Sequence, residues 1–476
     1  IGPKNYQLLK QLKQSWDPQN IFNPNKIVDT PPMNTMLRYT PGQQTPTFNT
    51  IFRYQNQDVL QHAEQCNGSG DCRKTHLSGG TMCPSFMATR NEKDTTRARA
   101  NILREFLTNS REVNRFNHKE IYEVMDLCLS CKACKSECPS NVDVAKLKAE
   151  FLQQYYDANG VPFRSKLIAN FSSSAKLGSM LPGIYNFMMT NKAISNLIKK
   201  STGFALDRSM PLMHKTTLQS WYKKHAKTVT KNSRTVYLFN DEFTNYNDTP
   251  IGIKAILLLE KLGYTVIIPT HVESGRAWLS KGLLRKAKLI ANKNIELLKN
   301  IISEDTPLIG IEPSAILTFR DEYIDLSDED QLDAAQTLSK NVFLIDEFIA
   351  AEIKKGHIKS EQFTVAEKQI LLHGHCQQKS LSNLSNTEQI LSFPKNYSVQ
   401  TIASGCCGMA GSFGYEKEHY DLSMQIGELV LFPAVRNKKN EAVIVAAPGT
   451  SCRHQIKDGT HTIAQHPVEI LFDALV

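Results

Sequence analysis

The sequence lacks any apolar run of the roughly 20 residues that a membrane-spanning helix needs. Its longer apolar runs, such as residues 442–447, have the length of a buried strand. No secretory signal is present, and the chain begins at Ile1 rather than at Met, so we expect a fragment whose natural start lies upstream. A basic face interleaved with aromatic residues is also missing. These absences predict a soluble protein with no transmembrane segment and no nucleic-acid partner.

Cysteine is absent from the long middle of the chain, between Cys138 and Cys376. The 11 cysteines fall instead into two groups, one between Cys66 and Cys138 and the other between Cys376 and Cys452. A secreted protein stapled by disulfides would not concentrate its cysteines in this way. The distribution therefore predicts two metal- or cluster-binding sites rather than a disulfide framework.

The composition is that of a globular protein with several domains. The chain has 476 residues, 41% apolar and 22% charged, which is too long for one ordinary core. Much of the net charge of +9 comes from residues 223–234, which we interpret as a solvated linker. Residues 177–206 carry a stripe of Met, Leu and Ile that favours interdomain packing, with a contact to a membrane or a quinone as the alternative. We expect a cytoplasmic protein, with peripheral contact at the inner face of the membrane left open.

The first 233 residues are predicted to be mainly helical. Residues 1–30 carry a helical pattern with Leu8, Leu9 and Leu12 on one face, and Pro18 and Pro24 end it. Residues 31–58 are rich in Thr, Pro and Gln, which is typical of an extended linker. Residues 59–160 contain three amphipathic helical patterns and predict an α-helical domain, and residues 161–233 predict a helical connector.

Beyond residue 234 short apolar strands alternate with helices, which is typical of α/β units with a parallel sheet. Strand-like runs at 236–239, 265–268 and 308–311 are followed by runs at 369–372, 399–402 and 442–446. The loops after corresponding strands also align, residues 273–277 with 406–410 and residues 312–315 with 448–452. We therefore predict two copies of one unit, at residues 234–355 and 356–476, of which only the second kept its cysteines.

The most specific motif is a run of four cysteines spaced by two, two and three residues, with Pro139 after the last. Three thiolates at this spacing can bind three corners of an iron–sulfur cubane, whereas the fourth binds the other cluster in two-cluster ferredoxins. A zinc site would typically use two cysteine pairs with a longer gap. The motif therefore predicts iron–sulfur binding by Cys128, Cys131, Cys134 and Cys138.

An upstream half of the motif contains Cys66, Cys72 and Cys83, with Ser69 where the template has a middle cysteine. Crossed ligation leaves one complete set of four thiolates and one set of three. Three thiolates suit a three-iron cluster, or a four-iron cluster with an oxygen ligand. The alternative is that Cys66 and Cys72 are ordinary buried thiols. The predicted first set is Cys83, Cys128, Cys131 and Cys134, and the second is Cys66, Cys72 and Cys138, with Ser69 or an outside atom at the fourth corner.

A second cysteine constellation follows the ends of the later predicted strands, where parallel sheets gather ligands. Adjacent cysteines form a strained disulfide but can hold one metal from two directions, and Gly408 lets the backbone turn close to it. His373 and His375 could add a nitrogen ligand, although histidines at strand ends are more often supporting or surface groups. The alternative to a metal or cluster is a redox-active or merely buried thiol group. The predicted ligands are Cys376, Cys406, Cys407 and Cys452.

Together these motifs resemble the iron–sulfur region of FAD-linked oxidases of the D-lactate, glycolate and D-2-hydroxyglutarate dehydrogenase type. Residues 60–476 resemble that region along their whole length, and residues 67–70, 310–314 and 320–323 look characteristic of its long, fused branch. Residues 1–30, with Asp17-Pro18 and Asn23-Pro24, resemble the end of the FAD-linked oxidase domain. The resemblance implies an α+β multidomain chain, in which an α-helical ferredoxin-type domain precedes two α/β repeats of the Cys-Cys-Gly type.

The second repeat is similar to the heterodisulfide reductase B-subunit domain, in which an intact repeat carries five cysteines that can hold a noncubane cluster. Here Gly449 stands in place of one of them. In the first repeat Glu273 and Ser274 replace the cysteine pair and Ala315 replaces another, so no metal is expected there. The four thiolates of the second repeat suit a simpler iron–sulfur cluster or zinc.

By resemblance, the chain is the electron-transfer portion of an FAD-linked D-2-hydroxy acid dehydrogenase. FAD would sit in an upstream domain of the same chain, and one or two iron–sulfur clusters would pass single electrons to a quinone or a carrier protein. No catalytic residue for hydride transfer and no flavin-binding glycine pattern is visible, so this part alone is expected to be inactive toward substrate. Two alternatives are an iron–sulfur subunit of a heterodisulfide-reductase-like or anaerobic glycerol-3-phosphate dehydrogenase complex, and a zinc-stabilised interaction module without redox function.

Overall fold

The computed structural model describes residues 1–37, 42–55, 57–228, 233–438 and 440–476. The described residues form two compact units, Ile1–Pro46 and Thr47–Val476. The predicted linker at 31–58 and the basic run at 223–234 therefore lie partly outside the described residues. None of the helices in the described part of the chain has the length and apolar character that a bilayer crossing requires.

The described residues of the smaller unit include the helix α1 (Gly2–Trp16), which confirms the helical pattern predicted for this segment. The helix stops at Asp17, whose carboxylate accepts hydrogen bonds from the backbone N–H groups of Ile21 and Phe22 at 2.8 and 2.9 Å. Leu8 and Leu12 lie on one face of α1 and are each 57% exposed. The leucine face of the predicted helix is therefore largely exposed in this unit.

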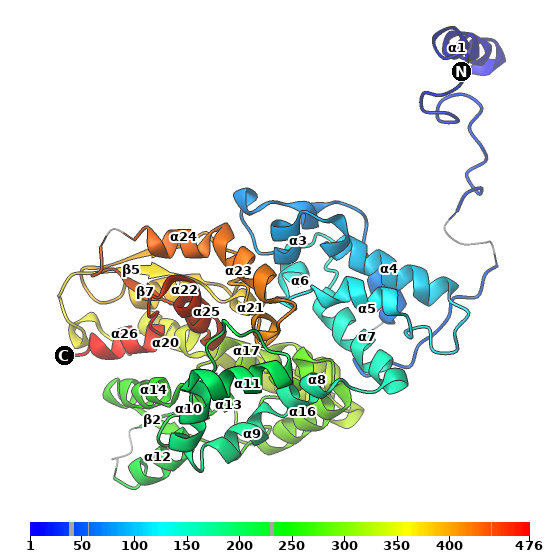
Figure 1. The fold of residues 1–476 in the computed structure, drawn as a ribbon. Helices are drawn as coiled ribbons and strands as arrows, with labels where there is room; N and C mark the ends of the chain where they lie inside the picture. The colour runs from blue at the N-terminus through cyan, green and yellow to red at the C-terminus, as the bar shows by residue number, and fades with distance from the viewer. Residues whose placement is uncertain (38–41, 56, 229–232, 439) are drawn as a thin grey trace. The chain divides into compact units, whose positions relative to one another are not determined.

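Residues 59–160 fold into helices, as predicted (Figure 1). Most of their cysteines lie at helix ends or in the loops between helices. Polar caps start the longer helices, because Thr95 accepts from the Ala98 N–H and Asp143 accepts from the Lys146 N–H, both at 3.1 Å. The apolar faces of the longer helices are buried at residues 103, 107, 121, 125, 147 and 151. The elements are α2 (Val59–Glu64), α3 (Pro84–Thr89), α4 (Thr96–Asn109), α5 (Lys119–Asp126), α6 (Ala133–Glu137) and α7 (Val144–Asn159), with 3-10 turns at Asp71–Arg73, His76–Ser78 and Glu92–Asp94.

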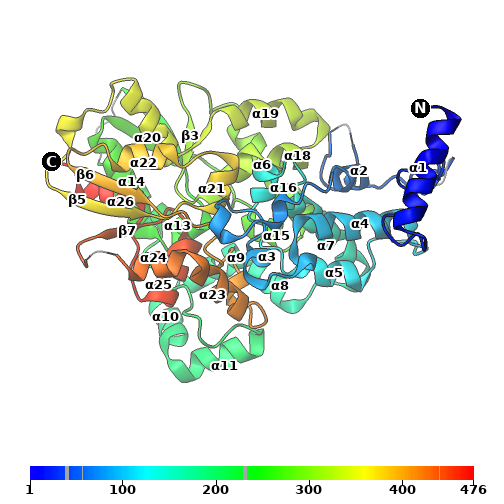
Figure 2. The same ribbon diagram turned by 90° about the horizontal axis from the view of Figure 1, so that it is seen from above.

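The connector is helical too. Figure 2 shows α10 and α11 at one edge of the molecule, away from the two sheets. All side chains of α10 stay at least partly exposed, although most of the residues in this helix are apolar. The elements are α8 (Phe163–Ala169), α9 (Phe171–Gly178), α10 (Pro182–Thr190), α11 (Lys192–Thr202) and α12 (Leu218–His225).

The first parallel sheet has the strand order β2-β1-β3-β4. Its register pairs Val236 with Val266, and Leu238 with Ile309. Three strands confirm the predicted runs, and a fourth, β4, was not predicted because three residues are too few to show a strand pattern. The strands are β1 (Arg234–Phe239), β2 (Tyr264–Ile267), β3 (Leu308–Gly310) and β4 (Val342–Leu344). The helices are α13 (Glu242–Tyr246), α14 (Thr249–Lys261), α15 (Arg276–Ser280), α16 (Leu284–Leu298), α17 (Pro313–Ile316), α18 (Glu322–Leu326), α19 (Leu332–Lys340) and α20 (Ile345–Lys354), with 3-10 turns at Leu317–Arg320 and Glu329–Gln331.

The second parallel sheet has the order β6-β5-β7, so in both sheets the first strand lies between the second and the third. Ile370 pairs with Val399 on one side and with Ile444 on the other. The strands are β5 (Lys368–Leu372), β6 (Tyr397–Thr401) and β7 (Ile444–Ala446). The helices are α21 (Cys376–Leu381), α22 (Ser385–Leu391), α23 (Tyr420–Leu429), α24 (Leu431–Arg436), α25 (Thr450–Thr460) and α26 (Pro467–Asp473), with 3-10 turns at Ser360–Gln362 and Phe413–Tyr415.

One apolar cluster joins the two sheets, since it contains Val236 and Leu238 together with Ile370 and Leu372. A second cluster joins the helical region of residues 59–160 to helices of the first sheet. The described chain is thus a mixed helix-and-sheet protein with small parallel sheets. Because parallel strands end at one edge of a sheet, the loops that carry the later cysteines meet at the carboxyl edge of the second sheet.

Candidate metal centres

The four cysteines of the predicted first set surround one small cavity of about 20 Å³. Cys83 reaches it from the residue before α3, with a positive φ of 57°. Ser130 and Lys132 alternate with the motif cysteines and also have positive φ, at 52° and 62°, which turns the loop around the cavity. The structure thus brings Cys83 beside three cysteines of the downstream motif. The cysteines that line the cavity are Cys83, Cys128, Cys131 and Cys134.

These thiols are held in an apolar environment with a few hydrogen-bond donors. Burial raises the pKa of the Cys83 thiol to about 12 and raises the pKa of Cys134 well above its usual range. The Thr96 N–H donates to the Cys83 sulfur at 3.0 Å, and the Val144 N–H donates to the Cys134 sulfur at 3.4 Å. A metal that binds thiolates offsets this burial cost with positive charge, and N–H···S bonds are the usual support of cluster ligands. The donor set therefore fits an iron–sulfur cluster.

The predicted second set is only partly assembled. Burial raises the pKa of the Cys72 thiol, and the nearby Cys66 raises it further. Cys66 and Cys138 are half-buried, whereas Cys72 is buried. Ser69 is exposed, and its backbone N–H donates to Asn67 Oδ1 at 3.0 Å. Ligation by Cys66, Cys72, Cys138 and Ser69 remains a prediction.

The paired-cysteine site brings together four buried thiols from three loops of the second sheet. Cys407 interacts with Cys406 and with Cys452, and Cys406 also interacts with Cys376. The sulfur atoms of Cys407 and Cys452 and a ring nitrogen of His373 lie within 4.8 Å of one another. The tertiary structure therefore brings together residues that lie far apart in the sequence.

His373 supplies the strongest independent sign of a missing ligand at this site. The ring is fully buried at the end of β5, and its Nδ1 lies 2.7 Å from the Ser404 hydroxyl. The other nitrogen, Nε2, is buried without a hydrogen bond of normal geometry among the described residues, and the ring interacts with the Cys407 thiol. A buried unpaired nitrogen costs free energy unless a metal or a donor satisfies it. The sequence left two roles open for His373, a nitrogen ligand or a supporting group.

The electrostatics divide the four thiols into two kinds. Hydrogen bonding from Cys406 lowers the pKa of Cys407 well below its usual range, and it lowers the pKa of Cys376 to about 7. Interaction with Cys407 raises the pKa of Cys452, and interaction with Cys376 and Cys407 raises that of Cys406. Two thiolates beside two donors are chemically suited to a cation.

Two glycines shape the loops of this site. Gly408 has a φ of 95°, and a Cβ at this position would lie 2.3 Å from the Ser423 carbonyl oxygen, so only glycine fits. Gly449 stands where a fifth cysteine would be expected, and a Cβ there would lie 3.3 Å from the Cys452 sulfur but 2.4 Å from the His375 ring. The His375 ring therefore takes the space that a fifth thiol would need.

The corresponding positions of the first sheet form a different network. The Ser274 hydroxyl donates to Glu242 Oε1 at 2.7 Å, and the Ser274 N–H donates to Glu242 Oε2 at 3.0 Å. Burial raises the pKa of Glu273 to about 7. Glu312 reaches across to the second sheet, where its Oε2 accepts from the Thr450 N–H at 2.8 Å.

The two cysteine regions are neighbours in space, which the sequence did not indicate. Burial raises the pKa of the Cys131 thiol well above its usual range, and Cys376 is the next largest contributor to that rise. The Ser380 hydroxyl lies 3.5 Å from the Cys131 carbonyl oxygen, and the loop before Cys406 packs on residues 80–81. No spacing rule relates residues this far apart in a chain, so no local signal could have shown this contact.

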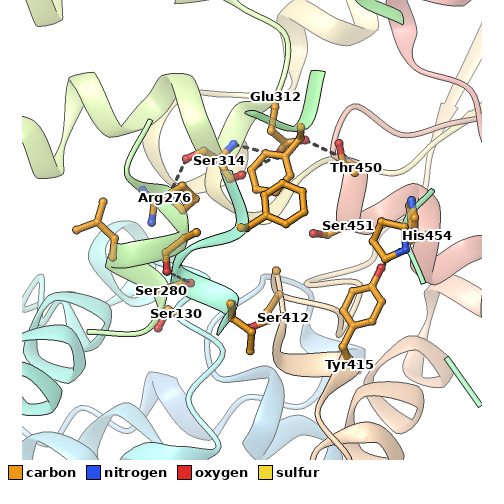
Figure 3. Close-up of a pocket in the computed structure, with 18 of the residues that line it drawn as sticks. Ser130, Arg276, Ser280, Glu312, Ser314, Ser412, Tyr415, Thr450, Ser451 and His454 are labelled. Carbon is orange, nitrogen blue, oxygen red and sulfur yellow. Dashed lines mark hydrogen bonds between the residues drawn. The ribbon is translucent and has the colours of Figure 1, made fainter. Parts of the chain in front are cut away.

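A larger cavity of about 460 Å³ adjoins both regions. Its lining includes Cys376 and Cys407 on one side and residues of the loop around Ser130 on another. Figure 3 shows Arg276, Glu312 and Ser314 on one side of this cavity, and His454 and Tyr415 on the other. Arg276 donates from Nε to the Ser314 carbonyl oxygen at 2.8 Å.

Comparison with known proteins identifies two segments of the chain. Residues 65–143 match the 4Fe-4S dicluster domain, and residues 1–27 match the C-terminal domain of FAD linked oxidases. These matches confirm the iron–sulfur motif and the resemblance of the first residues to an oxidase tail. No solved structure matches the chain.

Among curated proteins, the chain is 26% identical over 522 residues to D-2-hydroxyglutarate dehydrogenase from Escherichia coli (strain K12), with 100% of this chain and 50% of that protein covered. A D-2-hydroxyglutarate dehydrogenase from Pseudomonas putida is 27% identical, with 98% of this chain and 49% of that protein covered. The chain thus spans about half the length of these relatives, whose names make them oxidoreductases. One subunit of the anaerobic glycerol-3-phosphate dehydrogenase from Escherichia coli (strain K12) is 23% identical, with 71% of this chain and 83% of that protein covered. These relatives and domain matches agree on one conclusion: the chain contains a 4Fe-4S dicluster domain and is similar to the iron–sulfur region of FAD-linked oxidases.

Proposed function

We propose that this chain is the electron-transfer portion of an FAD-linked D-2-hydroxy acid dehydrogenase. The observation that carries the proposal is the contact between the two cysteine regions, in which the Ser380 hydroxyl lies 3.5 Å from the Cys131 carbonyl oxygen and Gly405 packs on residues 80–81. Iron–sulfur clusters bound there would supply one-electron steps between a flavin, which takes a two-electron hydride, and an acceptor. In this proposal FAD belongs to an upstream domain of the same chain, whose end is represented by residues 1–27.

The ligand assignment follows the small cavity lined by the first set and the crossed motif of the sequence. We assign a four-iron cluster to the first set, Cys83, Cys128, Cys131 and Cys134. The second set, Cys66, Cys72 and Cys138, is assigned a three-iron cluster, or a four-iron cluster with Ser69 or an outside atom at the open corner. The protein's contribution is to bury the sulfurs and to aim backbone N–H groups at them, as Thr96 and Val144 do.

The paired-cysteine site is assigned an iron–sulfur cluster or zinc, held by Cys376, Cys406, Cys407 and Cys452. The unpartnered Nε2 of His373 supports a metal rather than a group of inert thiols. His373 is oriented for this role by the hydrogen bond between its Nδ1 and the Ser404 hydroxyl.

The proposed architecture keeps the boundaries that the sequence predicts. A ferredoxin-type domain at residues 59–160 and a helical connector at 161–233 precede a degenerate Cys-Cys-Gly repeat at 234–355 and a second repeat at 356–476. The shared strand order, with the first strand in the middle of each sheet, supports a duplicated unit. The oxidase tail (1–30) and the linker (31–58) complete the assignment.

We further propose that helices α8–α11, named here the helical cap, touch the inner face of a membrane. Residues 158–206 contain six basic residues and no acidic one. Lys166, Lys176, Lys192 and Lys200 are exposed beside apolar side chains, a pattern that suits an anionic bilayer surface. The exposed apolar side chains of the cap are Phe163, Leu177, Met180, Leu181, Ile184, Phe187 and Leu197.

Membrane contact can be tested by sedimentation of the protein with vesicles. Binding to vesicles that contain phosphatidylglycerol should exceed binding to neutral phosphatidylcholine, and Phe187→Asp should weaken it. Leu289→Asp is the matched control, because Leu289 is a similarly exposed apolar residue on α16, outside the cap. Equal effects of the two substitutions would place the contact elsewhere.

The electron-transfer role is tested on protein that is purified without oxygen. It should be brown, contain iron and acid-labile sulfide, and bleach on addition of dithionite. A colourless protein that contains only zinc would favour the interaction-module alternative. The sequence upstream of Ile1 separates the fused dehydrogenase from a separate iron–sulfur polypeptide of a larger complex, since the latter would have no flavin domain in the same chain.

A further inference from the structure

The cavity of about 460 Å³ has the size and the lining of a small-molecule site. Ligand cavities in proteins span roughly 300–1,000 Å³ and are mostly apolar with a few polar groups. Here the helical cap supplies Leu167, Phe171, Met189 and Ile198 to one wall. We propose that this cavity binds the ring of a quinone-class electron acceptor, which is reduced there. The inference rests on the proposed function and names the acceptor that the function leaves open.

The cavity lies where electrons would become available. Cys376 and Cys407 of the paired-cysteine site line it directly, and so do Leu129 and Ser130 from the loop between two cysteines of the ferredoxin motif. A ring in this cavity would be in contact with residues of both regions. A carrier protein would need a broad surface site, whereas an apolar cavity of this size suits a small, apolar acceptor.

The polar groups of the cavity suit a ring that carries two carbonyl oxygens. Arg276 donates from Nε to the Ser314 carbonyl oxygen and from Nη2 to Glu322 Oε1, each at 2.8 Å, and its Nη1 forms no hydrogen bond with another described residue. On the other side in Figure 3, the Tyr415 hydroxyl lies 3.1 Å from His454 Nδ1. Donors thus face the cavity from two sides with apolar side chains between them.

Two buried acceptors around this cavity lack a donor. Glu322 and Gln377 both line the cavity, and each is more than nine-tenths buried. Glu322 Oε2 and Gln377 Oε1 have no hydrogen-bond partner among the described residues. Unpaired buried oxygens are costly, and a hydroquinone offers two hydroxyl donors that could satisfy them. The reduced form of the acceptor therefore has partners here as well as the oxidised form.

The reaction balances without a further reagent. A quinone gains two electrons and two protons and leaves as the hydroquinone. The electrons come from the D-2-hydroxy acid of the proposed function, and the protons come from solvent. Long-chain quinones dissolve in bilayers, and the helical cap that lines the cavity with one face exposes apolar side chains on the other. This arrangement places the cavity beside the proposed membrane contact.

The test fills the cavity and measures binding. Ser280 lines the cavity at the end of α15, and its hydroxyl donates to the Ala277 carbonyl oxygen at 2.9 Å. Ser280→Phe should reduce the space for a ring. Ser339→Phe is the matched control, because the exposed Ser339 makes the same bond to the carbonyl three residues earlier, at 2.7 Å. Ser412→Phe fills the cavity from another segment of its lining, so that agreement between two variants does not depend on one local change.

Equilibrium dialysis with a short-chain ubiquinone analogue gives the first readout, on the oxidised full-length protein. The parent protein and Ser339→Phe should bind one equivalent, and both cavity variants should bind at least about tenfold more weakly with unchanged melting temperatures. The absence of saturable binding, or unchanged binding by both cavity variants, would overturn the inference. Because dialysis measures binding without turnover, it tests the quinone site even if the proposed electron-transfer role is wrong.

Reoxidation of dithionite-reduced protein gives the second readout. The cavity variants should be slow with the quinone analogue but normal with ferricyanide, a small hydrophilic oxidant that does not need an apolar cavity. Failure with both oxidants in the parent protein would count against the proposed function. Normal ferricyanide reoxidation without any quinone reaction would count against the cavity alone.

Discussion

The two α/β units, residues 234–355 and 356–476, share a strand order, but different side chains lie at the carboxyl edges of their sheets. In the second unit Cys407 and Cys452 meet near His373, whose Nε2 forms no hydrogen bond of normal geometry among the described residues. In the first unit the matching loop holds Ser274, which is paired with Glu242 through two hydrogen bonds. The scaffold is therefore kept in both, while only the second brings buried thiols to its carboxyl edge.

This difference separates the side chains that stabilise the loops of the fold from the side chains that form the predicted site. The first unit closes its loop at Ser274 with hydrogen bonds between buried polar groups. It also supports the second unit, because Glu312 accepts a hydrogen bond from the first turn of α25, which carries Cys452. The first unit thus helps to position the helix that carries Cys452, and the second unit carries the predicted ligands.

The largest expected effect comes from removing one ligand of the second unit. Cys407→Ser should lower the metal content and destabilise the protein by about 3–5 kcal/mol, because a structural metal contributes folding free energy. Hydrogen exchange should become faster in residues 369–476, while the ferredoxin-type clusters keep their visible absorption. Unchanged metal content, measured by plasma mass spectrometry, would show that the four thiols hold no common centre.

A smaller effect is expected at the corresponding position of the first unit. Ser274→Ala removes the hydroxyl donor to Glu242 Oε1, which should cost about 1–2 kcal/mol for a buried acceptor left unpaired. The metal content should stay the same. Urea unfolding together with metal analysis checks this, and a loss of metal would mean that the first unit is not an empty copy.

The acidic network of the first unit should make its stability depend on pH. Burial, together with the neighbouring Glu242, raises the pKa of Asp241 to about 8 from a usual value of 3.8. The folded state therefore holds a proton that the unfolded state releases, so stability falls as the pH rises between about 4 and 8. Asp241→Asn keeps an oxygen acceptor for the Thr244 N–H and should reduce that fall. Urea midpoints at pH 6 and pH 8 should differ less in the variant than in the parent protein, and an equal difference would rule out Asp241 as the source.

The smallest effect on stability, but a clear spectroscopic one, is expected within the ferredoxin-type region, where a full and an incomplete set also coexist. Ser69 is exposed, so Ser69→Cys should change the free energy of unfolding by less than about 0.5 kcal/mol. If Ser69 faces the second cluster, oxidised parent protein should give a three-iron EPR signal that the substitution abolishes. A signal that persists would remove Ser69 from the ligand set.

Local patterns in the sequence were enough to predict much of the fold. The amphipathic faces of α4, α5 and α7 and six of the seven strands follow from side-chain periodicity, because burial acts on neighbouring turns and alternating residues. β4 was not predicted, since three residues between two helices show too little side-chain periodicity. The iron–sulfur motif was equally local, because a cubane needs three thiolates in one turn of chain.

The sequence by itself therefore determined the presence of a ferredoxin-type motif, the paired cysteines and the alternation of strands and helices along the chain. Only the tertiary structure decided that Cys131 lies beside Cys376, that His373 keeps an unpaired nitrogen, and that the helical cap encloses a cavity next to both. These features depend on contacts between segments more than a hundred residues apart or on which nitrogen of a ring is already bonded. Spacing along a chain specifies local geometry, whereas such contacts are set by how whole elements pack.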